Sequence, residues 1–214
     1  EALKGLQKFS VSAHISRDEM LPYGYKLQHN ESATMLVVRP DSMRVESQGD
    51  IKDRTYVYDG KQLTIFDPDQ NLYAESEAPA TIAELVDKLL DTGVEMPLLD
   101  ILIDAFSGPG TLTAQVQSGL RVSDSSINGI EVDHLAFRQA NVDWQVWVQK
   151  GEHALPLKFV ITTRYEQGDP QVDATLTWNL KPSVASKSFR FAPPKDARKV
   201  PVYTGGVVKQ ESGQ

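Results

Sequence analysis

The histidines are the side chains best suited to metal binding or acid–base chemistry, and they are scattered along the chain. None of the four lies at a spacing typical of a local metal pair; they are His14, His29, His134 and His153. Alternation along extended strands directs His14 and His29 to opposite faces of a sheet. We therefore interpret the histidines as surface or hydrogen-bonded residues, and we predict no metal site and no cofactor.

One acidic segment resembles the start of a calcium-binding loop. Residues 67–71 read Asp-Pro-Asp-Gln-Asn, with acidic or amide side chains at alternate positions. A calcium loop also needs Gly at its sixth position and Glu at its twelfth. This chain has Leu72 and Ala78 there. A turn explains the segment better, because Asp, Pro and Asn all favour turns.

The sequence contains none of the common catalytic or nucleotide-binding motifs. Glycine-rich phosphate loops, the nucleophile elbow and the zinc-protease helix motif are all missing. The absence of cysteine excludes disulfides, thiol catalysis and thiolate metal sites. Asp133 beside His134 could act as an acid–base pair, but acids flanking strand residues are common. We predict that the chain is not an enzyme. A hydrolase is the least favoured alternative, since it needs distant acids or histidines to converge in a cleft.

Composition limits the partners of this 214-residue chain. Its formal net charge is −7, and an acidic chain has no general attraction for nucleic acid or anionic membranes. The apolar run at 98–106 is too short to span a bilayer and is interrupted by Asp100 and Asp104. We predict no nucleic-acid partner and no transmembrane segment. Glu1 begins in helix-like sequence without a signal peptide, so we expect a trimmed N-terminus.

Alternating polar and apolar residues predict an antiparallel sheet. The alternation is clear from Phe9 to Ser16, where every second residue is apolar. We expect about eleven such strands, at 9–16, 26–38, 42–47, 53–58, 62–66, 71–76, 113–123, 130–139, 144–149, 157–165 and 171–180. The pairs Asp59-Gly60 and Asn128-Gly129 predict tight hairpins in which both central residues have positive φ.

Helices are expected at the N-terminus and in the middle of the chain. Ala2–Lys8 has apolar residues three apart. Thr81 and Glu84 form a capping box that begins a helix, and Gly93 suits its end. A second helix opens at Pro97 and is apolar nearly all round. This second helix is either a buried core helix or a lid over an apolar cavity.

The tryptophans leave the same two alternatives open. Trp144 and Trp147 are three apart on one strand, so they face opposite sides of the sheet. Trp178 shares a face with Leu176 and Ala174. Core packing with one amphipathic ring at the surface explains these residues, and so does direct contact with a ligand.

Together these elements predict a mainly β (α+β) fold. Open twisted sheets of more than ~10 strands tend to close or split. We therefore expect an incomplete, highly curved antiparallel β-barrel of about eleven strands, with helices covering its concave apolar face. The whole chain, 1–214, is expected to form one domain, with a helical lid inserted at about 79–110 and a loose C-terminal tail from about 195.

Several segments together resemble a known family. They are RPDSMRV (39–45), YDGK (58–61), FDP (66–68), HLAFR (134–138), VDWQVW (142–147), LPLKFVIT (155–162) and WNL (178–180). From about 9 to 194 the chain resembles a family of predicted bacterial periplasmic proteins of unknown function. That family is similar to the LolA/LolB lipoprotein-carrier superfamily. The resemblance implies an incomplete antiparallel barrel whose helices plug a hydrophobic cavity, and it implies export to the periplasm.

We therefore predict a periplasmic binding module for a hydrophobic ligand: a lipid, an acyl chain or a lipoprotein. Burial of each CH₂ of an acyl chain contributes roughly 0.8 kcal/mol, so binding needs no catalytic group. The candidate cavity residues are Leu85, Leu89, Leu98, Leu102, Phe106, Leu135, Phe137 and Phe159. The alternative is a cell-envelope sensor or protein–protein interaction module without a transported ligand, whose partner is another envelope protein.

Overall fold

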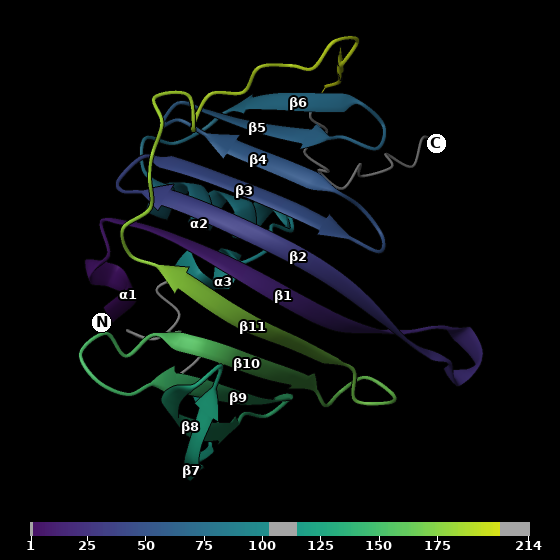
Figure 1. Ribbon diagram of the computed structural model, residues 1–214. Helices are drawn as coiled ribbons and strands as arrows, with labels where there is room; N and C mark the ends of the chain where they lie inside the picture. Colours follow the sequence, from purple (N-terminus) through teal and green to yellow (C-terminus); the bar gives the residue numbers. More distant parts are fainter. Residues whose placement is uncertain (1, 103–114, 202–214) are drawn as a thin grey trace, which may run out of the picture.

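One large sheet organises the protein. The computed structural model describes residues 2–102 and 115–201, and within these residues twelve strands form a single sheet (Figure 1). The strands of the first half are β1 (Lys8–Met20), β2 (Lys26–Val38), β3 (Ser42–Gly49), β4 (Arg54–Tyr58), β5 (Gln62–Asp67) and β6 (Leu72–Glu77). Those of the second half are β7 (Ser118–Ile127), β8 (Ile130–Arg138), β9 (Val142–Gln149), β10 (Pro156–Thr163), β11 (Gln171–Asn179) and β12 (Arg198–Lys199).

The predicted strands correspond to β1 through β11, although most strand ends differ from the predicted ends by a few residues. The additional strand, β12, lies in the tail that was expected to be loose. It pairs in parallel with β6, where the Arg198 amide donates to the Asn71 carbonyl at 3.0 Å and the Val200 amide donates to the Tyr73 carbonyl at 2.8 Å. A two-residue strand is too short to show alternation, so the sequence pattern did not reveal it.

The sheet is open. Its strand order is β12-β6-β5-β4-β3-β2-β1-β11-β10-β9-β8-β7, so the two edges lie at opposite ends and do not meet. All neighbouring strands are antiparallel except β12 and β6. The predicted mainly antiparallel β fold is confirmed. The expected strong curvature is wrong, because the sheet is not strongly curled, and it is not closed.

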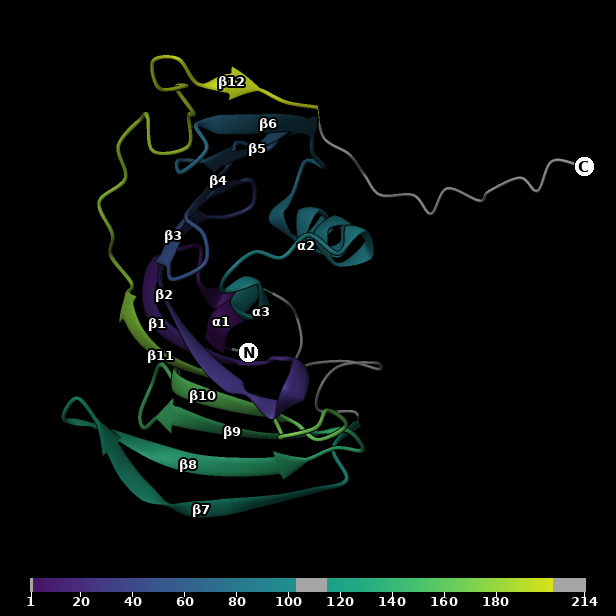
Figure 2. The same cartoon turned by 90° about the vertical axis from the view of Figure 1, so that its right-hand side faces the viewer.

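Strand alternation divides the sheet into two faces. Phe9, Val11 and Ala13 of β1 are buried on the face that we call inner, whereas Ser12 and His14 are exposed on the outer face. Figure 2 shows the helices on the concave, inner side of the sheet. The main hydrophobic core therefore lies between the inner face and the helices.

The central helix forms as its sequence predicts. The helices are α1 (Ala2–Gly5), α2 (Ile82–Thr92) and α3 (Leu99–Leu102), with a 3-10 turn η1 (Pro22–Gly24) between β1 and β2. Within the described ranges, none of them is long and apolar enough to cross a membrane. At the start of α2 the Glu84 amide donates to Thr81 Oγ1 at 3.3 Å, and the Thr81 amide donates to Glu84 Oε2 at 3.2 Å. Gly93 ends the helix in the left-handed conformation, with φ 67°.

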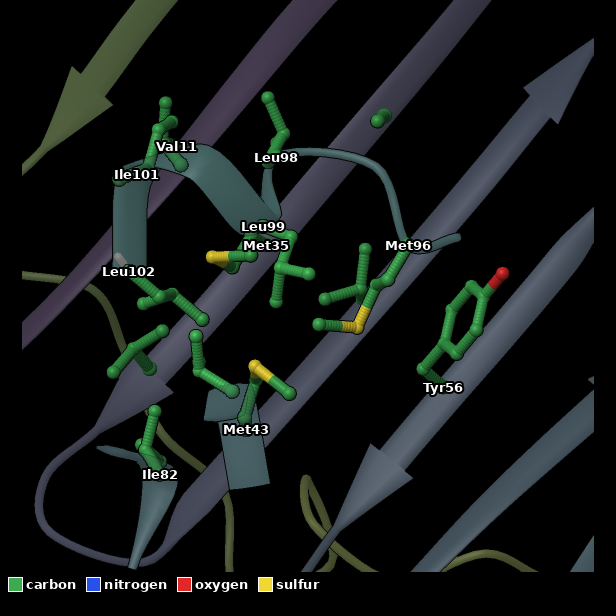
Figure 3. Packing of buried hydrophobic residues seen from close by; sticks show 14 of the residues in the cluster. Val11, Met35, Met43, Tyr56, Ile82, Met96, Leu98, Leu99, Ile101 and Leu102 are labelled. Atoms are coloured by element: carbon green, nitrogen blue, oxygen red, sulfur yellow. The ribbon is translucent and has the colours of Figure 1, made fainter. Parts of the chain in front are cut away.

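The second predicted helix starts later than expected. Leu98 has a φ of 64°, which is incompatible with a right-handed helix, so α3 begins at Leu99 rather than Pro97. The rest of the predicted helix, 103–106, lies outside the described residues. Leu99, Ile101 and Leu102 of the described part are buried in the main core, and Figure 3 shows them together with Val11 and Met35 of the sheet.

The two predicted tight hairpins differ from each other. Asn128 and Gly129 both have positive φ, at 50° and 80°, as expected. At the other turn Gly60 has a φ of 83°, but Asp59 does not enter the positive region. Instead, the Asp59 carboxylate accepts hydrogen bonds from the amides of Lys61 and Gln62, at 3.1 and 2.9 Å. This side-chain turn replaces the second left-handed residue.

Candidate ligand-binding cavity

A cavity of about 600 Å³ lies between the segment that contains α2 and α3, which we call the helical segment (79–102), and the inner face of the sheet. This volume falls within the range of small-molecule sites, roughly 300–1,000 Å³. Its sheet side is lined by Ile15, Tyr56, Phe159, Ile161 and Val172. Its helical side is lined by Leu89, Leu90, Val94, Met96, Pro97, Leu98 and Leu99. Apolar carbon from both sides of the core therefore faces one shared space.

The floor of the cavity depends on contact between strands that are distant in sequence. Ile15 of β1 pairs with Ala174 of β11, and Ala174 pairs in turn with Phe159 of β10. Val172 pairs with Ile161 in the same two strands. Residues that pair across antiparallel strands share a face, so these side chains line the inner face next to one another. The floor forms only when β1 and β11 pair.

Two tyrosine hydroxyls attach the helical segment to the sheet. Tyr56 Oη donates to the Glu95 carbonyl at 2.8 Å, and Tyr58 Oη donates to the Pro79 carbonyl at 2.5 Å. Burial raises the pKa of Tyr56 to about 12, and it raises the pKa of Tyr58 to about 12 as well. Both phenols are therefore neutral donors near neutral pH. They hold the residues on either side of α2, Pro79 and Glu95, over the inner face.

Part of the lining is exposed, and we call these residues the mouth: Arg17, Asn30, Asp50, Ile51, Lys52, Leu90, Gly93 and Glu95. The mouth includes two large apolar side chains, since Ile51 is 67% exposed and Leu90 is 51% exposed. Lys52 and Glu95 form an ion pair at 3.8 Å. The mouth thus combines exposed apolar side chains with charged groups.

The predicted cavity residues fall into three groups. Leu89, Leu98 and Phe159 line the cavity. Leu85 and Leu102 are buried in the main core without lining it.

The third group is remote from the cavity. Leu135 and Phe137 lie on β8, and the ring of Phe137 stacks on Trp144 with centroids 4.1 Å apart. Neither residue lines the cavity. Phe106 lies outside the described residues.

Sequence reasoning missed most of the sheet side of the lining. Ile15, Ile161 and Val172 belong to predicted strands, so alternation identified their faces but not their shared cavity. Tyr56 carried no earlier signal as a lining residue. A polar aromatic residue on an inner face, opposite a helical insert, is the feature that could have pointed to it.

The candidate acid–base and metal residues do not converge. His14 bonds Ser32 on the outer face at 3.2 Å, while His29 bonds Glu19 at 2.7 Å, so the two histidines face opposite sides as predicted. Asp133 pairs with Arg121 at 2.7 Å, whereas His134 stacks on Trp147. No group of three or more potential metal ligands occurs within residues 2–102 and 115–201.

The calcium-like segment is a turn, as predicted. Asp67 Oδ1 accepts from the Gln70 amide at 3.0 Å, and its other oxygen pairs with Arg54 at 2.6 Å. Both carboxylate oxygens therefore serve the structure of the turn.

The tryptophans contribute to packing. Trp144 and Trp147 point to opposite faces, as expected, since Trp147 stacks on His134 of the outer face with centroids 4.0 Å apart. Trp178 packs against Phe9, with centroids 5.6 Å apart, and its Nε1 donates to the Pro156 carbonyl at 2.7 Å. None of the three lines the cavity formed by the described residues.

Residues 1–203 match the family model described as "Predicted periplasmic protein (DUF2092)". The chain belongs to this family. The resemblance inferred from the sequence segments is confirmed, and the family places the protein in the periplasm, as expected. No curated protein sequence matches this periplasmic chain.

Solved structures with TM-scores of 0.50 or more share the fold of this DUF2092 protein at low sequence identity. An uncharacterized conserved protein from Thermus thermophilus matches with a TM-score of 0.52 and 14% identity, covering 94% of each chain. LprF from Mycobacterium bovis matches with a TM-score of 0.50 and 14% identity, covering 86% of this chain and 91% of LprF. A LolA superfamily protein from Nitrosomonas europaea also matches, with a TM-score of 0.31 and 10% identity, covering 86% of this chain and 90% of that protein.

Proposed function

We propose that this periplasmic protein is a binding module for a hydrophobic ligand, such as a lipid or the acyl chain of a lipoprotein. The observation that supports this function is the cavity of about 600 Å³ between the helical segment and the inner face, which apolar side chains line from both sides. We further propose that the segment from Pro79 to Leu102 acts as its lid. The proposal describes a binding protein rather than an enzyme.

The energetics of such a site need no specific polar contact. Transfer of an acyl chain from water into an apolar cavity contributes roughly 0.8 kcal/mol for each CH₂. The half-buried side chains of Phe159, Ile161 and Val172 gain the corresponding contacts when a chain occupies the cavity. Exposed Leu90 and Ile51 at the mouth extend the apolar surface toward solvent.

We test the proposal by filling the cavity. Val172→Trp places a large ring on the inner face of β11, and Thr177→Trp places the same ring on the exposed outer face of that strand. The full chain and both variants are purified from the bacterial periplasm and analysed by native mass spectrometry, followed by organic extraction. We expect bound lipid on the wild type and on Thr177→Trp, and about fivefold less on Val172→Trp.

Two outcomes of this experiment would contradict the proposal. If the folded wild type carries no lipid and takes none from vesicles, the binding function is wrong. Equal lipid on both tryptophan variants places the ligand somewhere other than this cavity. Far-UV circular dichroism confirms that each variant retains its sheet.

An envelope interaction module is the second candidate, and the free edge of β7 favours it. β7 ends the strand order, so one of its edges has no strand partner within the described residues. Its Leu120 is 60% exposed and Val122 is 47% exposed. A peptide strand from another envelope protein could pair with this edge through main-chain hydrogen bonds. A ligand-free wild type would make this candidate the leading one.

A further inference from the structure

Among the described residues, two charged side chains of the cavity lining have no ionic partner. Arg17 of β1 and Glu31 of β2 both line the cavity. Within residues 2–102 and 115–201, neither side chain makes a hydrogen bond or an ion pair. The neighbouring charges are engaged, because His29 bonds Glu19 at 2.7 Å and Lys52 pairs with Glu95 at 3.8 Å. Asp50 is also engaged, since its carboxylate accepts from the Asn30 amide at 2.6 Å.

The register places these two charges on the same face, side by side. Arg17 pairs with His29 and Ile15 pairs with Glu31 across the β1–β2 ladder. Arg17 and Glu31 are therefore diagonal neighbours on the inner face, with Cα atoms about 7–8 Å apart. Their charged ends do not approach within ion-pair distance, so each one remains available to a ligand.

Of these two charged groups, the carboxylate of Glu31 says more about the ligand. Its side chain is half-buried beside Tyr56, and its charge adds to the effect of burial in raising the pKa of that phenol. A half-buried carboxylate without a partner is costly, because it loses solvation without gaining a compensating hydrogen bond. A cationic group of a bound ligand would supply that partner.

We propose that the cavity binds the zwitterionic head group of a phospholipid, with its phosphate at Arg17 of the mouth and its ammonium at the half-buried Glu31. The inference rests on the proposed function, because the acyl chains occupy the apolar cavity. A guanidinium forms paired, charge-assisted hydrogen bonds with phosphate, and a carboxylate accepts hydrogen bonds from an ammonium group. The two charges of the head group thus match the two charges of the cavity lining that have no partner among the described residues.

The other charges of the lining favour a zwitterionic over an anionic lipid. Two permanent cations, Arg17 and Lys52, face three carboxylates, Glu31, Asp50 and Glu95. A head group with a net negative charge meets this acidic surplus without offering a cation to Glu31. A phosphoethanolamine head group is neutral overall and offers one.

The experiment measures head-group preference. The delipidated full chain is incubated with vesicles that contain equal amounts of phosphatidylethanolamine and phosphatidylglycerol, and bound lipids are counted by native mass spectrometry. We expect the wild type to prefer phosphatidylethanolamine. Glu31→Gln is expected to lower the ratio of bound phosphatidylethanolamine to bound phosphatidylglycerol about fivefold. Arg17→Gln is expected to lower the occupancy of both phospholipids about fivefold.

Matched controls lie on the outer face. Arg44 and Glu46 of β3 form an ion pair at 2.6 Å there, so Arg44→Gln and Glu46→Gln change the same charges away from the cavity. Neither control is expected to alter the lipid ratio. If Glu31→Gln leaves the ratio unchanged, or if both controls change it equally, the head-group assignment is overturned.

A neutral lipid separates failure of this inference from failure of the proposed function. Diacylglycerol has the acyl chains but neither charge of the head group. We expect it to bind the wild type, Arg17→Gln and Glu31→Gln equally well. Diacylglycerol binding without any head-group preference overturns the inference alone, whereas the absence of diacylglycerol binding overturns the proposed function as well.

Discussion

At the scale of single residues, two buried phenols connect the sheet to the segment around α2. Tyr56 and Tyr58 come from one strand and donate to backbone carbonyls before and after α2. A buried carbonyl that loses its donor costs free energy, because no water replaces it. These two hydroxyls therefore stabilise the position of the segment that covers the cavity.

The raised pKa values of these tyrosines predict a loss of stability at alkaline pH. Phenols of the unfolded chain ionise near 10.0, whereas burial raises the pKa of Tyr56 and of Tyr58 to about 12. Between these values the unfolded state binds fewer protons, so the free energy of unfolding falls as pH rises. Tyr56→Phe/Tyr58→Phe is expected to weaken this dependence and to cost about 1 kcal/mol per hydrogen bond at pH 7.

Urea unfolding at pH 7, 10 and 11 measures the effect. Tyr23 is 100% exposed and Tyr25 is 68% exposed, so Tyr23→Phe/Tyr25→Phe serves as the control and is expected to match the wild type. An identical decline in all three proteins would show that other groups cause the alkaline loss.

At the scale of elements, α2 has the strongest local signals in the chain. Its capping box, its left-handed Gly93 and its buried apolar stripe all specify the same helix. Ile82, Leu85, Val86 and Leu89 are buried against the sheet, while Leu90 lies at the cavity mouth. The helix thus forms part of the core and part of the cavity at once.

The N-terminal cap of α2 should contribute measurably to stability. Thr81→Ala removes the hydroxyl that accepts from the Glu84 amide, and we expect a loss of about 1 kcal/mol in the free energy of unfolding. Thr81→Ser keeps the hydroxyl and is expected to lie within about 0.3 kcal/mol of the wild type. Chemical denaturation compares the three proteins, and equal losses for alanine and serine would contradict a capping role.

At the scale of the whole molecule, the β1–β11 pair joins the two large groups of strands in the sheet, and the short β12 makes a second, two-residue contact with β6. The first half of the chain supplies β1 through β6 and the second supplies β7 through β11, and these groups meet where β1 pairs with β11. Ala13 and Ala174 are buried on the inner face at this junction. The core and the cavity floor both cross it, so the two halves should unfold together.

A charge at the junction tests this cooperativity. Ala174 is 0% exposed, so Ala174→Glu buries a carboxylate without a partner and is expected to cost more than about 3 kcal/mol. Thr177→Glu on the exposed outer face of the same strand is expected to cost less than about 0.5 kcal/mol. Unfolding is followed by circular dichroism and tryptophan fluorescence. Separate transitions for the two probes in the wild type would contradict a single cooperative sheet.

Local sequence patterns predicted the elements of this protein well. Alternation of period two identified strands such as β1 and β2 and the faces of their residues, because successive side chains of a strand must point to opposite sides. The capping box predicted the start of α2, and the Asn128-Gly129 pair predicted a turn with two left-handed residues. Each of these features depends on neighbours in the chain, so the sequence by itself was sufficient.

The tertiary structure decided what depends on contacts between distant residues. Positive φ at Leu98 moved the start of α3, and pairing with β6 created β12. The cavity brings together β1, β10 and the residues after α2, which local periodicity does not relate. A pattern along the chain states which face a side chain occupies, but only packing determines which side chains share that face and where space remains between them.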